Sequence, residues 1–299
     1  QEIKELTVDF NVDSAYYFIS KQVEFGPRVI SSSAWQECAL WLEKKLKSYA
    51  DKVIIQEAPI ITYDGKKHVM KNIIASFAPK KENRIALFAH WDSRHIADHD
   101  NKNVDSPILG ANDGGSGVGV LLELARQFSK KNPRIGIDII LFDAEDYGPP
   151  ENENYKLPEN YQSFWCLGSQ YWSKSPHKVG YSANYGILLD MVGGENATFY
   201  FEATSKKFAE EVLNNVWRTG HSLGHKKHFI YQDSPQITDD HLFVNNIAKI
   251  PTIDIIEYNP KTKTKFNKHW HTHKDDMNNI NKETLTAVGE TLLNVIYRE

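Results

Sequence analysis

Residues 134–148 read RIGIDIILFDAEDYG, a run of branched and aromatic residues that ends in three acids within four positions. A near-continuous apolar run of this kind is typical of a strand buried on both faces of a sheet. Asp143, Glu145 and Asp146 follow at what would be the carboxyl end of that strand. Ligands of open α/β sheets bind at this edge. The stretch therefore predicts an α/β fold and the place of its functional site.

The chain has 299 residues, of which 40% are hydrophobic and 25% are charged, so it can bury a full core. No linker or internal repeat divides it, and we expect one catalytic α/β domain over residues 1–299. The net charge of −4, without a basic stripe, excludes nucleic acid as an expected partner. No apolar run is long enough to form a transmembrane segment. The start at Gln1, with neither an initiator Met nor a signal sequence, would suit a processed export precursor.

The pattern of apolar residues predicts alternating strands and helices. Helices are expected at residues 14–24, 34–49, 168–172, 206–220 and 282–297, and others begin after the glycine-rich segment 110–117 and at 238–241. Strands are expected at 52–62, 68–77, 84–90, 185–189 and 250–256, and the first two form an antiparallel edge hairpin. The alternation predicts a mixed central sheet with helices on both faces. Two polar segments are expected as loops: 148–164, over the site, and 266–276.

Acids and histidines gather where these elements end. Asp113, the Glu145/Asp146 pair and a histidine of the 266–276 loop supply the oxygen and imidazole ligands that zinc takes in open, catalytic sites. In an adjacent acid pair, one carboxylate can bind the metal while its neighbour moves protons. Spacing alone does not select among the three histidines of that loop, His269, His271 and His273. For Asp113 taken alone, a helix cap is the alternative role. Two cysteines, Cys38 and Cys166, are too few for a thiolate zinc site and suit core positions.

Six motifs, in order along the chain, resemble the zinc aminopeptidase-like fold, and within it the animal-type (type II) glutaminyl cyclases. They are His-x-Asp-Ser at His90, Ala-Asn-Asp-Gly at Asp113, Asp-Ala-Glu-Asp at Glu145, Leu-Leu-Asp-Met-Val-Gly at Asp190, Asp-Asp-His at Asp239 and Trp-His-Thr at His271. The resemblance runs from about Asn72 to the C-terminus. It implies one Zn²⁺ per chain, held by Asp113, Asp146 and His271. It also implies catalytic roles for Glu145, Asp190 and Asp239, and a substrate pocket walled by Trp165, Phe266 and Trp270.

Peptidases of the same fold are the alternative function. They bind two zinc ions, with the equivalents of His90 and Asp190 holding the second, and both residues are present here. Three features resemble the cyclases instead: the doubled acid before His241, Trp270 before the metal histidine, and Phe266 four residues upstream of Trp270. A binding protein without catalysis is disfavoured, because neither the base nor a metal ligand is missing.

The chain also departs from the animal enzymes. Asp146 stands where they have Glu, Ala89 replaces a cysteine of their disulfide, and the 148–164 loop is longer, which leaves Trp165 as the candidate for the pocket aromatic. These departures resemble a bacterial branch that is exported to the periplasm or secreted. The resemblance implies a glutaminyl-peptide cyclotransferase, an acyltransferase that cyclises N-terminal glutamine to pyroglutamate and releases ammonia. Its partners would be peptides and proteins with N-terminal glutamine, and we expect a monomer.

Overall fold

A six-stranded mixed sheet forms the centre of the computed structural model, which describes residues 9–150 and 155–299. The strand order is β1-β2-β4-β3-β5-β8. The strands are β1 (Lys52–Ile61), β2 (Lys67–Phe77), β3 (Arg84–His90), β4 (Gly136–Phe142), β5 (Gly186–Asp190) and β8 (Thr252–Ile256). The last four run parallel, and β1 and β2 add an antiparallel edge. The predicted mixed α/β sheet and its edge hairpin are confirmed.

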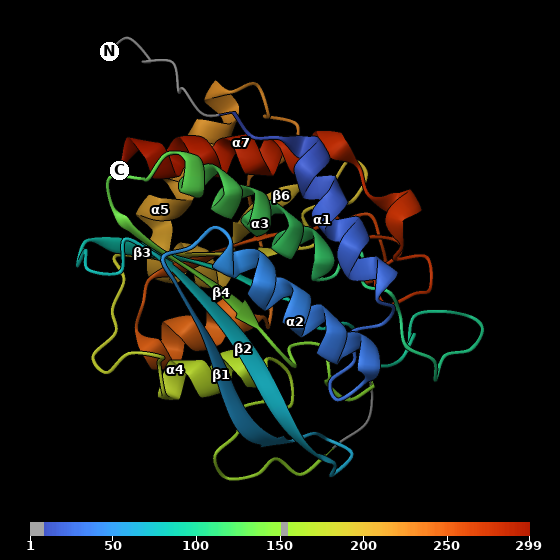
Figure 1. Ribbon diagram of the computed structural model, residues 1–299. Coiled ribbons are helices and arrows are strands. Elements are labelled where there is room, and N and C mark those ends of the chain that lie inside the picture. The colour runs from blue at the N-terminus through green and yellow to red at the C-terminus, as the bar shows by residue number, and fades with distance from the viewer. Residues whose placement is uncertain (1–8, 151–154) are drawn as a thin grey trace.

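Helices cover both faces of the sheet, as the alternation of elements predicted (Figure 1). They are α1 (Val12–Glu24), α2 (Ser33–Lys47), α3 (Gly115–Lys130), α4 (Leu167–Lys174), α5 (Ala203–Ser222), α6 (Asp240–Phe243) and α7 (Lys282–Arg298). Successive strand residues point to opposite faces. Ile85 and Leu87 of β3 therefore join the core under α1, α2, α3 and α7, whereas Ala86 and Phe88 join a second core with Trp172 of α4.

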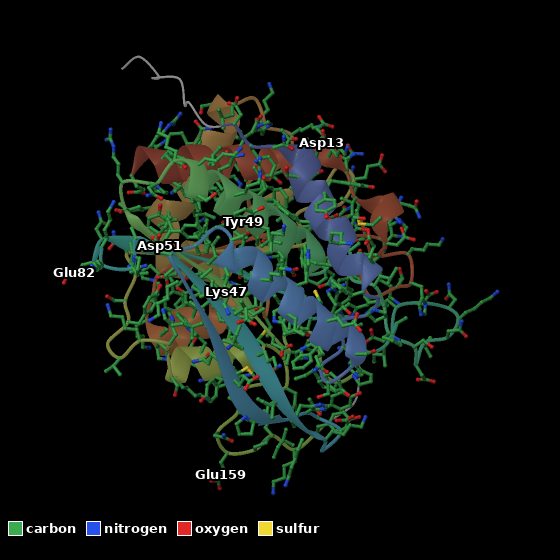
Figure 2. The ribbon with its side chains drawn as sticks, viewed as in Figure 1. Asp13, Lys47, Tyr49, Asp51, Glu82 and Glu159 are labelled. Carbon is green, nitrogen blue, oxygen red and sulfur yellow. The ribbon has the colours of Figure 1, made fainter. Side chains whose placement is uncertain are left out.

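β4 is buried along its whole length, which agrees with its near-continuous apolar sequence. Its one charged residue, Asp138, is satisfied inside the core by Arg84, whose Nε lies 2.6 Å from Asp138 Oδ2, and by hydrogen bonds from Ser76 and Tyr181. A buried carboxylate is tolerated only with such partners. Other charged side chains, including Glu82 and Glu159, project from the rim of the molecule (Figure 2). Within the described ranges, no helix has the length and apolar character needed to cross a membrane.

A second, two-stranded sheet was not predicted from the sequence. It consists of β6 (Phe199–Glu202) and β7 (Phe229–Ser234), joined by α5, and β6 meets the chain just after β8 through a bridge between Phe199 and Glu257. Both strands are short and only partly buried, so they lack the apolar runs that marked the central strands. The two predicted loops, 148–164 and 266–276, contain no helix or strand in their described residues. Gln1 and residues 151–154 lie outside the described part of the chain.

Candidate active site

The parallel strands bring their carboxyl ends to one edge of the sheet, where a cavity of about 270 Å³ opens. All nine residues predicted as catalytic, substrate-binding or metal-binding line it. The acids are Asp113, Glu145, Asp146, Asp190 and Asp239, joined by His271 and the aromatics Trp165, Phe266 and Trp270. A sixth acid, Asp98, also lines the cavity and was not predicted. The cavity is therefore lined mainly by acidic and aromatic side chains.

Asp113, Asp146 and His271 offer ligand atoms that all lie within 4.8 Å of one another. His271 Nε2 lies 3.2 Å from Asp146 Oδ1 and 3.7 Å from Asp113 Oδ2. Asp146 Oδ2 is buried without a hydrogen-bond partner, which is a costly state for a carboxylate oxygen. Two carboxylates and an imidazole lie this close together, and one carboxylate oxygen lacks a partner. This donor set fits a divalent cation such as zinc. Of the other two histidines in this loop, His273 pairs instead with Asp100, at 3.0 Å.

Three further carboxylates hold these groups in position. Asp92 accepts hydrogen bonds from the backbone N–H groups of Glu145 and Asp146, both at 3.1 Å. Asp275 accepts from the N–H of Asp113, also at 3.1 Å. Asp98 Oδ1 lies 3.1 Å from His271 Nδ1, on the side of the ring away from the ligand cluster. A carboxylate in that position fixes the orientation of a metal-binding imidazole.

The turn after β4 directs Asp143 away from its neighbours Glu145 and Asp146. Ala144 adopts a left-handed conformation with φ 53°, which is unfavourable for a residue with a Cβ and occurs mainly at functional turns. On one side of it, Asp143 is buried and accepts hydrogen bonds from Trp35 Nε1 and Lys71 N–H. On the other side, Glu145 and Asp146 line the cavity. Asp143 is therefore structural, and the adjacent pair faces the site.

Burial shifts the pKa values of the acids that line the cavity. It raises the pKa of Glu145 well above its usual range, and the neighbouring carboxylate of Asp146 adds to the effect. Burial and the nearby charge of Asp113 raise the pKa of Asp190 to about 8. Burial likewise raises the pKa of Asp239. Carboxyl groups with raised pKa values can take up and release protons near neutral pH.

His90 lies beside the metal cluster. Its Nε2 is 3.0 Å from Asp113 Oδ1 and 3.3 Å from Asp190 Oδ1, and the three side chains form a second group of ligand types that shares Asp113 with the first. The residues that hold a second zinc in peptidases of this fold are thus close together here as well. This arrangement alone does not separate the two candidate functions.

Three aromatic side chains also line the cavity. The ring of Trp270 stacks on His271 with centroids 3.7 Å apart, and Phe266 packs against Trp270 at 4.9 Å. Trp165 lies nearly parallel to the His271 ring at 6.2 Å. The guanidinium carbon of Arg94 lies 4.5 Å from the centroid of the Trp165 ring, and this cation–π contact helps to hold the ring in place. Trp165, the candidate that the resemblance offered for the pocket aromatic, lines the cavity.

A buried network beyond Asp239 was missed by sequence reasoning. His241 Nε2 lies 3.0 Å from Glu202 Oε2, and its Nδ1 lies 3.4 Å from Asp254 Oδ2. Asp254 in turn contacts Asp239. Asp254 lies within the predicted strand 250–256, and nothing near Glu202 in the sequence suggested a partner so far along the chain. This network supports Asp239 from the side opposite the cavity.

Comparison with known proteins supports this description of the fold. Residues 72–296 match the profile of peptidase family M28. A crystal structure of a zinc-dependent exopeptidase from Parabacteroides distasonis is 51% identical, with a TM-score of 0.94, and covers 98% of this chain and 100% of that one. A Bacteroides thetaiotaomicron glutaminyl cyclase bound to N-acetylhistamine is 50% identical, with a TM-score of 0.93, and covers 98% and 100%.

A curated relative is more distant. The glutaminyl-peptide cyclotransferase of Gloydius blomhoffii is 23% identical over 252 residues, which are 74% of this chain. The match spans 63% of the length of that relative.

Proposed function

The chain belongs to peptidase family M28, and from that premise we propose that it is a glutaminyl-peptide cyclotransferase. The proposal rests mainly on the small cavity, which is lined both by acids and by the aromatic side chains of Trp165, Phe266 and Trp270. The acids suit a cationic α-amine beside a metal, and the aromatic wall suits one short side chain. The similarity to a bacterial glutaminyl cyclase at 50% identity over nearly the whole chain supports the same activity.

We propose that Asp113, Asp146 and His271 hold one Zn²⁺ per chain. Zinc at this position supplies Lewis-acid polarisation of the substrate's amide oxygen. Asp98 keeps the His271 ring oriented, and Asp92 fixes the backbone that carries Asp146. The ligands therefore come from three separate loops whose positions are set before substrate binds.

In the proposed reaction, the α-amine of an N-terminal glutamine attacks the carbon of its own side-chain amide. A new C–N bond closes the five-membered ring, the bond to the amide nitrogen breaks, and ammonia leaves with pyroglutamate as the product. Glu145 takes the proton from the attacking amine and passes it to the departing nitrogen, a task suited to its raised pKa. Asp190 and Asp239 line the same cavity, and their raised pKa values let each carry a proton, so we propose that they hold Glu145 and the departing nitrogen by hydrogen bonds. Trp270 and Phe266 keep the side chain folded back on the amine.

A zinc aminopeptidase is the second candidate, because His90, Asp113 and Asp190 lie together beside the first cluster. A parallel assay on a glutaminyl substrate and on alanyl or leucyl arylamides separates the two functions. Ammonia release without arylamine release supports the cyclase. Faster cleavage of the alanyl arylamide would replace it with the peptidase. Glu145→Gln, assayed alongside, reports contaminating activity in the preparation.

Three further properties belong to the proposal. We propose that the protein acts in the periplasm or is secreted, that it acts as a monomer on peptides and proteins with N-terminal glutamine, and that residues 1–299 form one catalytic domain. Fractionation of the source cells tests the location. Light scattering on the purified protein tests the monomer, and limited proteolysis tests the single domain.

A further inference from the structure

Cys166 lies against the turn that carries Glu145. The residue follows Trp165 directly, precedes α4 as its N-cap in a left-handed conformation with φ 59°, and is completely buried. Its Sγ lies 3.1 Å from Glu145 Oε1. The N–H groups of Cys166, Leu167 and Gly168 donate to the carbonyls of Glu145, Ala144 and Asp143 at 2.9, 3.0 and 3.0 Å. These three bonds hold the start of α4 in register with the acidic turn.

The thiol is placed as a hydrogen-bond donor. Burial raises the pKa of the Cys166 thiol well above its usual value, and the charge of Glu145 adds to the effect, so sulfur keeps its proton. Glu145 acts as the proposed base in its ionised form, in which the carboxylate can only accept, and the S–H group then donates to Glu145 Oε1. A bond to one oxygen limits rotation of the carboxylate, while the second oxygen stays free to exchange a proton.

We propose that Cys166 is a positioning residue, whose thiol holds the carboxylate of Glu145 in the orientation required for proton transfer. The same residue links that orientation to the cavity wall, because Trp165, which lines the cavity, directly precedes it. Cys166 does not line the cavity and acts only through Glu145. This inference rests on the proposed cyclase and on Glu145 as its base.

The test compares Cys166→Ala, which removes the donor, with Cys166→Ser, which keeps one. On a glutaminyl substrate, kcat of Cys166→Ala should fall roughly 3- to 10-fold with KM and zinc content unchanged, the loss expected for one hydrogen bond from a weak donor. Cys166→Ser should recover most of kcat. Wild-type kcat in Cys166→Ala, an equal loss in both variants, or loss of zinc would overturn the inference.

Cys38 provides a matched control, since it is a buried cysteine of α2 that does not line the cavity. Cys38→Ala should lower the melting temperature without lowering kcat. The infrared S–H stretching band gives a readout independent of activity. The band lost in Cys166→Ala should lie at lower frequency than the band lost in Cys38→Ala, and it should shift in Glu145→Gln. A wild-type protein without cyclase activity would reject the proposed function, whereas two S–H bands at the same frequency would reject the Cys166 contact.

Discussion

The indole of Trp270 stacks on the imidazole of His271, with ring centroids 3.7 Å apart and an angle of 24° between the planes. The wall of the cavity and a proposed zinc ligand are thus adjacent in sequence and in contact in space. His271 has a second support, because its Nδ1 lies 3.1 Å from Asp98 Oδ1. The ring can therefore keep its orientation when the stacking partner is removed, which makes the two roles separable.

Trp270→Ala tests the pocket wall. Loss of one aromatic contact should lower kcat/KM for cyclisation by about 1 to 3 kcal/mol of transition-state binding, while zinc content stays at the wild-type level. His271→Ala is the control, because it should lose zinc. Imidazole compounds should inhibit the wild type competitively, and they should bind more weakly to Trp270→Ala. Wild-type kinetics in Trp270→Ala would remove this residue from the substrate pocket.

Gly148→Ala tests the second wall. A Cβ at Gly148 would meet the Trp165 ring at 2.0 Å, so the indole would have to leave its place against the cavity. We expect kcat/KM to fall about as far as in Trp165→Ala, with zinc unchanged. The double variant should be no worse than Trp165→Ala alone, since both changes act through the same ring. Additive losses would show that Gly148 matters for another reason.

The long elements of the fold could be predicted because their apolar patterns are strong. β4 is the clearest example, with every residue buried and the acids at its carboxyl end. Short β6 and β7 carry no such pattern and depend on packing beside β8. Their sheet depends on contacts between residues far apart in the sequence, such as Phe199 with Glu257, which the local sequence does not encode.

The site shows the same division. Strand ends indicated Glu145, Asp146 and Asp190, and the start of a helix indicated Asp113. Spacing could not choose a histidine from the 266–276 loop, and that choice came from the resemblance. Asp98 and Cys166 could not be selected at all, because each acts through a partner far away in the sequence. Such pairings become visible only when the loops are placed together.

Glu145→Gln and Asp146→Ala test the division of labour in the acid pair. If Glu145 moves the proton, Glu145→Gln should keep zinc and the fold and lose on the order of a hundredfold or more in kcat. Asp146→Ala should instead lose the metal, because it removes a proposed ligand. Zinc content and kcat measured on the same preparations decide the matter. Equal metal loss in both variants would reverse the two roles.

Zinc stoichiometry tests the single-metal site. Elemental analysis of the purified protein should return one zinc per chain, and His90→Ala should retain it, because His90 is not a proposed ligand. Asp113→Ala should lose it. Two tightly bound zinc ions, with one lost in His90→Ala, would favour the aminopeptidase.

The stability of the protein in acid should depend on Glu202. Burial opposes ionisation of this side chain, but hydrogen bonds from His241 and from the N–H groups of Ser205 and Thr204 outweigh it and lower its pKa from 4.5 to about 2. A carboxylate with a lowered pKa stabilises the fold above its unfolded pKa. That stabilisation is lost as pH falls from 4.5 toward 2.

Glu202→Gln isolates this contribution. At pH 7 the variant should be less stable than the wild type by about 3 kcal/mol, and the difference should shrink as pH falls through the window between the two pKa values. Urea unfolding of both proteins, with a chelator present to remove any effect of metal, measures the difference at each pH. Asp64→Asn is the control. Hydrogen bonds from Lys66 and Thr62 lower the pKa of Asp64 to about 2, against its partial burial, but Asp64 lies in an exposed turn where solvent screens its charge. The control should therefore show a much smaller difference at pH 7. A difference between wild type and Glu202→Gln that stays constant from pH 7 to pH 2 would show that Glu202 stabilises the fold by packing and not by its charge.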